Sequence, residues 1–158
     1  MSAPAGFERD TAATLREGEL ARWVYRAEGA DVVLGKAVLT HMARGGAVEP
    51  EALASIAEQL ASRADTGTTW ALVRHETRRR HDGARVGIIE STQERPSPST
   101  PGERLRVATT QLVFPDDSGT SLVSISLPPD RVAEWRPRRG CLAGQIRRLP
   151  CPAFRTGG

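Results

Sequence analysis

Apolar residues in the first third of the chain recur at helical spacing. The spacing i, i+3, i+4 and i+7 places side chains on one face of an α-helix. One such stripe consists of Leu20, Trp23, Val24 and Ala27. Gly29 would end this helix, so the spacing predicts a first helix over about 11–28.

Two more helices are predicted before residue 65. Asp31 is a suitable N-cap for a second helix over about 32–44, and Gly45 follows its end. A third helix over about 50–64 begins at Pro50, a residue that the first helical position tolerates. Its apolar stripe is the clearest of the three: Leu53, Ile56, Ala57 and Leu60.

After residue 68 the period changes to two, which is typical of strands. Asp82-Gly83 predicts a tight hairpin turn. A flexible loop is expected at 93–103, an alternating strand from Leu105 to Val113, a turn at 115–119, and another strand from Leu122 to Leu127. The predicted fold class is therefore α+β, with three N-terminal helices packed on a small antiparallel sheet of about four strands in two hairpins.

The same patterns predict one domain with two loose ends. Residues 1–10 are expected to be disordered. A single α+β domain should span 11–128, helical over 11–65 and β over 68–128. Residues 129–158, which have no clear period, are expected to be an irregular C-terminal extension.

Charge is divided unevenly along the chain. Residues 1–70 hold seven basic and ten acidic side chains, whereas residues 71–158 hold fifteen basic and nine acidic ones. Of the 22 basic residues, 21 are arginine and one is Lys36. A basic half can attract nucleic acid, an anionic surface or an acidic protein, although an Arg-rich composition also follows from GC-rich coding.

An arginine cluster lies in the most informative segment, 66–92. Its members are Arg74, Arg78, Arg79, Arg80 and Arg85. The plainest interpretation is a solvated hairpin tip, and a second interpretation is a surface for nucleic acid or an acidic partner. Three helices followed by a basic hairpin resemble the layout of winged helix-turn-helix proteins. Glu51 and Glu58 on the third helix depart from that pattern, because phosphates repel an acidic recognition helix. A shifted register would instead make 68–80 a basic helix, so the choice between hairpin and helix for 70–92 stays open.

A short motif overlaps this cluster. Residues 72–77, Leu-Val-Arg-His-Glu-Thr, resemble the LxRHGET signature of histidine phosphatases, in which the histidine is phosphorylated and the arginine holds phosphate. The sequence departs from that signature, since no glycine separates His75 from Glu76 and only His81 follows. We find no further catalytic motif and predict no catalytic residue.

No metal or cofactor is predicted either. Cys141 and Cys151 are the only cysteines, and none of the three histidines gives a zinc spacing with them. Whether the two thiols are free or bonded stays open. Residues 1–16 lack the apolar core of a signal peptide, and no membrane span is apparent, so a cytoplasmic location is expected.

The C-terminal extension offers a second candidate interface. Trp135 stands among charged residues, and exposed tryptophan is enriched in binding hot spots, although packing on the chain's own sheet is an alternative. The candidate residues are Trp135, Arg136, Arg138 and Arg139. The leading functional prediction is a non-enzymatic adaptor or regulatory domain that binds a protein. The alternatives are a nucleic-acid-binding regulator using 74–85 and an enzyme of unrecognised type, and the sequence leaves homo-oligomer formation open.

Overall fold

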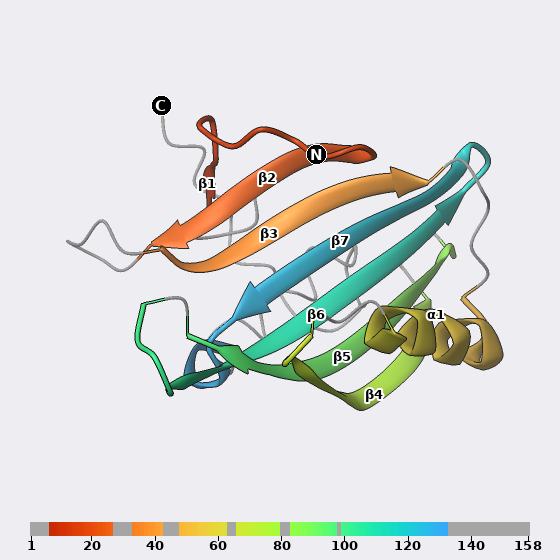
Figure 1. Cartoon of the computed structure of the whole chain (residues 1–158). Helices are drawn as coiled ribbons and strands as arrows, with labels where there is room; N and C mark the ends of the chain where they lie inside the picture. Colours follow the sequence, from red (N-terminus) through yellow and green to blue (C-terminus); the bar gives the residue numbers. More distant parts are fainter. Residues whose placement is uncertain are drawn as a thin grey trace.

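Long antiparallel strands dominate the computed structural model, which describes residues 7–26, 33–42, 48–62, 66–79, 83–97 and 99–132. These residues form one seven-stranded antiparallel sheet with the order β1-β2-β3-β7-β6-β5-β4 (Figure 1). The elements are β1 Glu8–Arg9, β2 Glu19–Arg26, β3 Val33–Met42, α1 Pro50–Ser62, β4 Thr69–Arg79, β5 Arg85–Pro96, β6 Arg104–Asp116 and β7 Gly119–Leu127.

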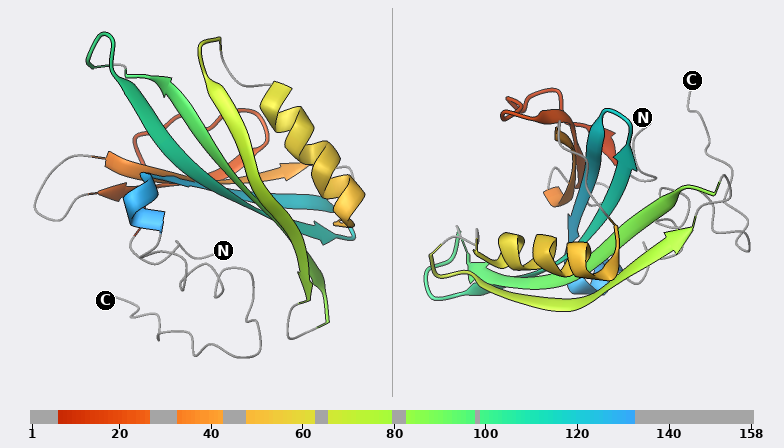
Figure 2. Two further views of the ribbon diagram at one scale, coloured as in Figure 1. Left: turned by 90° about the horizontal axis from the view of Figure 1, so that it is seen from below. Right: turned by 90° about the vertical axis from the view of Figure 1, so that its right-hand side faces the viewer.

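The helix α1 connects the two halves of the sheet. The chain leaves β3 in the middle of the sheet, passes through α1, and enters β4 at the far edge. Strands β5, β6 and β7 then return towards β3, with which β7 pairs. Figure 2 shows the strong twist of the sheet and the position of α1 on one face, beside β4 and β5.

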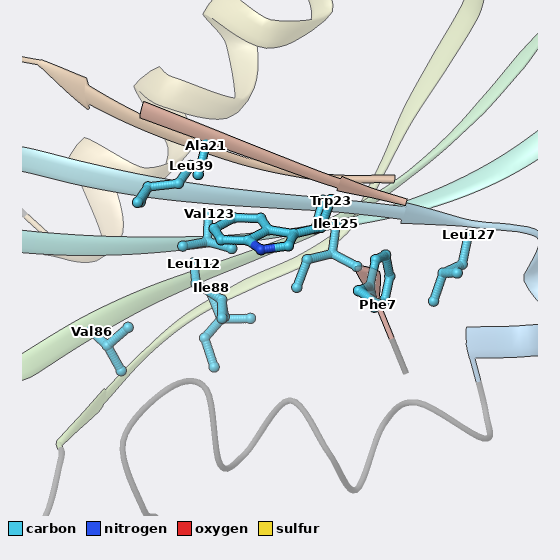
Figure 3. Close-up of a cluster of buried hydrophobic side chains, with 11 residues drawn as sticks. Phe7, Ala21, Trp23, Leu39, Val86, Ile88, Leu112, Val123, Ile125 and Leu127 are labelled. Carbon is cyan, nitrogen blue, oxygen red and sulfur yellow. The ribbon is translucent and has the colours of Figure 1, made fainter. Parts of the chain in front are cut away.

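Each face of the sheet carries its own apolar cluster. On the side covered by α1, called the helix face below, the buried residues are Val48, Leu53, Ala57, Ile89 and Val113. The opposite side, called the Trp23 face, is larger and includes Trp23, Ile88, Leu112, Ile125 and Phe7 (Figure 3). Because successive strand residues point to opposite faces, the neighbours Ile88 and Ile89 belong to different clusters.

A glycine sets how closely α1 approaches the sheet. A Cβ at Gly87 would lie 2.5 Å from Cδ2 of Leu53 and 3.3 Å from side-chain atoms of both Val48 and Val113. Leu53, which has no exposed surface, therefore occupies the space that a side chain at position 87 would need. The helix α1 thus packs directly against the backbone of β5 at Gly87.

The prediction of three helices on a four-stranded sheet is wrong. Residues 19–26 and 33–42, expected to be helical, are the paired strands β2 and β3. Ala21, Trp23 and Tyr25 alternate into the Trp23 face, while Leu20 is 55% exposed. A short segment rich in apolar residues satisfies both periods, and pairing with a partner strand decides between them.

Several other predictions are confirmed. The third helix exists as α1, and its predicted residues Leu53 and Ala57 are buried. The choice between hairpin and helix, which the sequence left open, is decided for strands, since β4 pairs antiparallel with β5 and Gly83, just before β5, has a positive φ of 86°. Strands β6 and β7 cover the two predicted alternating runs.

The predicted loop at 93–103 is partly wrong, because β5 continues to Pro96. One helical turn at 129–132 follows β7, within the predicted irregular extension. Of the residues 1–10 predicted to be disordered, 1–6 lie outside the described residues, whereas Phe7 is buried and Glu8–Arg9 form β1. The rest of the C-terminal extension, from 133 on, also lies outside the described residues. The domain boundaries themselves stay predictions.

Candidate functional site

The long strand β4 forms an edge of the described sheet. β4 pairs with β5 on one side, and no strand of the described residues pairs with its other side. The opposite edge is the two-residue strand β1. An edge strand presents unpaired backbone N–H and C=O groups to any extended segment that can align with it. β4, with eleven residues, is therefore the main site for such pairing in the described sheet.

Two exposed apolar side chains lie in the middle of this edge. Leu72 is 41% exposed and Val73 is 58% exposed. The pairing of β4 with β5 shifts register between Leu72 and Arg74, so Val73 is the extra residue of a β-bulge. Val73 also lines a pocket of about 230 Å³, whose other apolar lining residues include Ala108, Pro129 and Val132. Exposed apolar groups beside free backbone groups suit the capture of a partner strand.

Charged side chains occupy alternate positions of β4 after the bulge. The charged side chains of Arg74, Glu76 and Arg78 point to the Trp23 face, as does Glu90 opposite Arg74. The residues between them, His75 and Thr77, point to the helix face. Arg74 Nε donates to Glu90 Oε2, and Arg78 Nη2 lies 2.7 Å from Glu76 Oε1. The Glu90 side chain is only 8% exposed, so Arg74 supplies the opposite charge to a carboxyl group that is largely removed from water.

The two remaining described arginines of the cluster lie on the other face. Arg79 and Arg85 are opposite each other and point to the helix face. Arg85 forms an ion pair with Glu49, which precedes α1, and Arg79 Nη1 donates to the carbonyl of Gly83 at 3.4 Å. A hydrogen bond from its own backbone N–H, followed by the charge of Arg85, lowers the pKa of Glu49. The cluster is thus divided between two faces, and three of its members already have acidic partners.

This arrangement bears on the nucleic-acid alternative. Phosphate binding needs cations that are free of internal carboxylates, whereas Arg74, Arg78 and Arg85 are paired with Glu90, Glu76 and Glu49. The segment that would be a basic recognition helix is the strand β4. The long helix of the described residues, α1, carries the exposed acidic residues Glu51 and Glu58, which phosphates would repel. Arg80 lies outside the described residues.

The resemblance to histidine phosphatases is not supported by geometry. His75 is half-buried and points to the helix face, whereas Arg74 points to the Trp23 face. One phosphate group could not contact both side chains across the strand. His81 and the C-terminal candidates Trp135, Arg136, Arg138 and Arg139 lie outside the described residues, as do both cysteines.

No group of three or more histidine, cysteine, aspartate or glutamate side chains lies close enough to hold a metal ion in the part of the chain that the structure describes. Within the same part, no helix is both long and apolar enough to cross a membrane.

Sequence reasoning missed a set of polar residues on the helix face. Thr109 and Gln111 alternate with the core residues Thr110 and Leu112 along β6, and both are 7% exposed. Ser124 and Ser126 accompany them on β7. The available signal was that Thr109 and Gln111 interrupt an apolar series at every second position of β6, namely Leu105, Val107 and Val113.

The described chain is thus a single antiparallel sheet with one long helix on one face, and solved structures of this fold exist. Cyanobacterial PsbP from Synechocystis sp. PCC 6803 is similar with a TM-score of 0.59 and 11% identity, over 85% of this chain and 76% of that one. PA94 from Pseudomonas aeruginosa, a protein of unknown function, has a TM-score of 0.55 and 12% identity, over 92% of this chain and 96% of that one. The Ran-binding protein Mog1p from Saccharomyces cerevisiae has a TM-score of 0.50 and 14% identity, over 85% of this chain and 74% of that one.

Sequence comparison adds no closer relative. No protein-family model matches the chain, and no curated protein matches it. At these identities the three structures share a fold with this chain, and function has to be argued from its own surface.

Proposed function

We propose that the protein is a non-enzymatic binding module that captures an extended segment of a partner protein along β4. The observation that carries the proposal is that no described strand pairs with the outer side of this eleven-residue strand, at whose centre Leu72 and Val73 are exposed. Strand addition takes affinity from main-chain hydrogen bonds and specificity from alternate side chains. The fold is compatible with this role, since Mog1p is a Ran-binding protein.

The charges of β4 define the kind of segment that would fit. Arg79, next to the hairpin turn, makes a hydrogen bond to a carbonyl and no ion pair within the described residues. Among the residues that the structure describes, Arg78 has one carboxylate partner, Glu76, which also lies 3.9 Å from Arg74. A partner strand with apolar residues opposite Leu72 and Val73, and acidic residues towards Arg79, would complement this edge.

The bulge at Val73 favours a partner over aggregation. Bulges and charged residues on edge strands hinder indiscriminate pairing between sheets. A segment that binds here must accommodate the bulge and the arginines, which restricts the sequences that fit. Homo-oligomer formation stays open, and a cytoplasmic location remains a prediction from the sequence.

The test is a selection from random peptides of about the length of β4, displayed on phage, followed by synthesis of the best binder. We expect enrichment of alternating apolar and acidic residues. Leu72→Asp and Val73→Asp should each weaken binding of the synthetic peptide at least about tenfold, which is about 1.4 kcal/mol. Leu20→Asp is the matched control, because Leu20 is exposed to a similar extent on β2 near the other edge.

The outcomes separate the hypotheses. Equal weakening by all three substitutions would show a general effect of charge, and no weakening by the β4 substitutions would overturn the proposal. The nucleic-acid alternative predicts that random single-stranded DNA competes with the peptide in low salt. Competition that disappears in Arg78→Ala would support that alternative instead.

A further inference from the structure

A polar trough lies on the helix face, on the part of the sheet that includes β3, β7, β6 and the end of β5. Its volume is about 350 Å³. Polar residues from all four strands line it, among them Lys36, Gln93, Arg95, Thr109, Gln111 and Ser126. Ligand sites for small molecules have volumes of about 300–1,000 Å³, so the trough is near the lower end of that range.

The trough has a built polar floor. Thr109 Oγ1 lies 3.0 Å from Ser126 Oγ, and Gln111 Nε2 donates to Ser124 Oγ at 3.4 Å. Gln111 is 7% exposed, and its Oε1 has no hydrogen-bond partner among the described residues. A buried acceptor without a donor costs free energy, and a ligand O–H or N–H at this point would satisfy it.

Two cations without carboxylate partners lie at the rim. Within the described residues, neither Lys36 nor Arg95 forms an ion pair. Solvent reaches the Lys36 side chain, yet surrounding protein atoms desolvate it in part. This desolvation is the main cause of its lowered pKa, followed by the charges of Arg95, Arg22 and Arg16, while Glu19 opposes the change.

We infer that this trough is a binding site for a small hydroxylated organic anion, a carboxylate or phosphate of about the size of a hydroxy acid or a sugar phosphate. The anionic group would lie between Lys36 and Arg95, and a hydroxyl group would donate to Gln111 Oε1. An anion there would relieve the mutual repulsion of the two cations. The site is independent of the β4 edge, so it goes beyond the proposed function.

The chain contains its own probe for this site. Lys36 is the only lysine in the sequence, so selective isotope labelling of lysine gives a single side-chain NMR signal. Citrate and glucose 6-phosphate are the two test ligands. Tricarballylate, which is citrate without its hydroxyl group, and glucose, which lacks the phosphate, are the matched controls.

We expect citrate or glucose 6-phosphate to shift the Lys36 signal with saturation at millimolar concentration and to raise the pKa of Lys36. Glucose should not shift the signal. If citrate binds, tricarballylate should bind at least about threefold more weakly, and Gln111→Leu should abolish that preference. If glucose 6-phosphate binds and citrate does not, the affinity for glucose 6-phosphate should fall in Gln111→Leu.

Charge variants complete the experiment. Arg95→Ala should weaken binding at least about tenfold. Arg106→Ala removes the same charge from an exposed position on the neighbouring strand β6, on the Trp23 face, and should leave binding unchanged. Because Arg95 and Arg106 are both exposed, both variants should fold, which circular dichroism would verify. A Lys36 signal that neither anion shifts, or equal losses in both arginine variants, would overturn the inference.

Discussion

Leu53 of α1 gives the most quantitative test of the described packing. Its side chain has no exposed surface and lies against Gly87, Val48 and Val113. Leu53→Ala removes three carbon atoms, and at about 0.8 kcal/mol for each the lost burial amounts to about 2.4 kcal/mol. The cavity adds to this, because the rigid sheet below the helix cannot collapse into it. We expect a loss of about 3 kcal/mol in the free energy of unfolding, within the range of about 2–5 kcal/mol for buried Leu→Ala changes.

Urea unfolding followed by tryptophan fluorescence measures this loss, since Trp70 packs against the same cluster. The thermal midpoint should fall by about 6–12 °C. Leu20→Ala is the matched control, because the same atoms are removed from a side chain that is 55% exposed. Leu20→Ala should lower the free energy of unfolding by less than about 0.5 kcal/mol. A loss below about 1 kcal/mol for Leu53→Ala, with an unchanged dependence on urea, would contradict the docking of α1 described above.

Three further predictions concern other features of the fold. Gly87→Ala should destabilise the protein by about 1–3 kcal/mol, because the new Cβ would overlap Leu53; the double variant with Leu53→Ala should recover part of that loss in urea unfolding. Glu90→Gln should weaken the contact with Arg74 and lower stability by about 1–3 kcal/mol at neutral pH, and a double-mutant cycle with Arg74→Gln should show coupling rather than additivity. Because the pKa of Lys36 is lowered on folding, the unfolded state binds more protons between that lowered value and the ordinary value of about 10.4. The unfolding free energy of Lys36→Met relative to the wild type should therefore be highest at neutral pH and fall as the pH rises through this window; a pH-independent difference would contradict the lowered pKa.

The sequence predicted the second half of the fold better than the first half. The Asp-Gly pair and the alternation around Thr109 located the β4–β5 hairpin and β6, because these signals are local. The error in β2 arose because Trp23 belongs to both a helical stripe and a strand alternation. Pairing with distant segments stabilises the strand. The partner of β2, β3, itself pairs with β7 about 80 residues later in the chain, as the His41–Ser121 contact shows. Such long-range pairing leaves no signal in a short window.

The arginine cluster was visible in the sequence, but its geometry was not. The bulge at Val73 places Leu72 and Arg74 on opposite faces, although a regular strand would place them on the same face. The acidic partners of the cluster come from β4 itself, from β5 and from the segment before α1. Only the folded chain brings these segments together. The sequence alone therefore could not distinguish arginines paired with carboxylates from a basic patch without such partners.

The trough likewise could not be predicted from the sequence, because its residues come from separate strands. Gln111 and Ser124 lie on different strands and become neighbours through the β6–β7 register. In the sequence each is an ordinary polar residue within an alternating run. Lys36 was visible as the single lysine, but its proximity to Arg95 depends on the twist and order of the sheet.

Amide hydrogen exchange of β4 with and without the best selected peptide is the most direct test of the central claim. A partner strand added to the edge would hydrogen-bond to the outward backbone N–H groups of β4, which have no strand partner in the described sheet. We predict that alternate amides between Thr69 and Arg79 become at least about tenfold better protected, while the amides of β2 and β3 do not change. Bound peptide with unchanged exchange in β4, or protection confined to another element, would contradict the account.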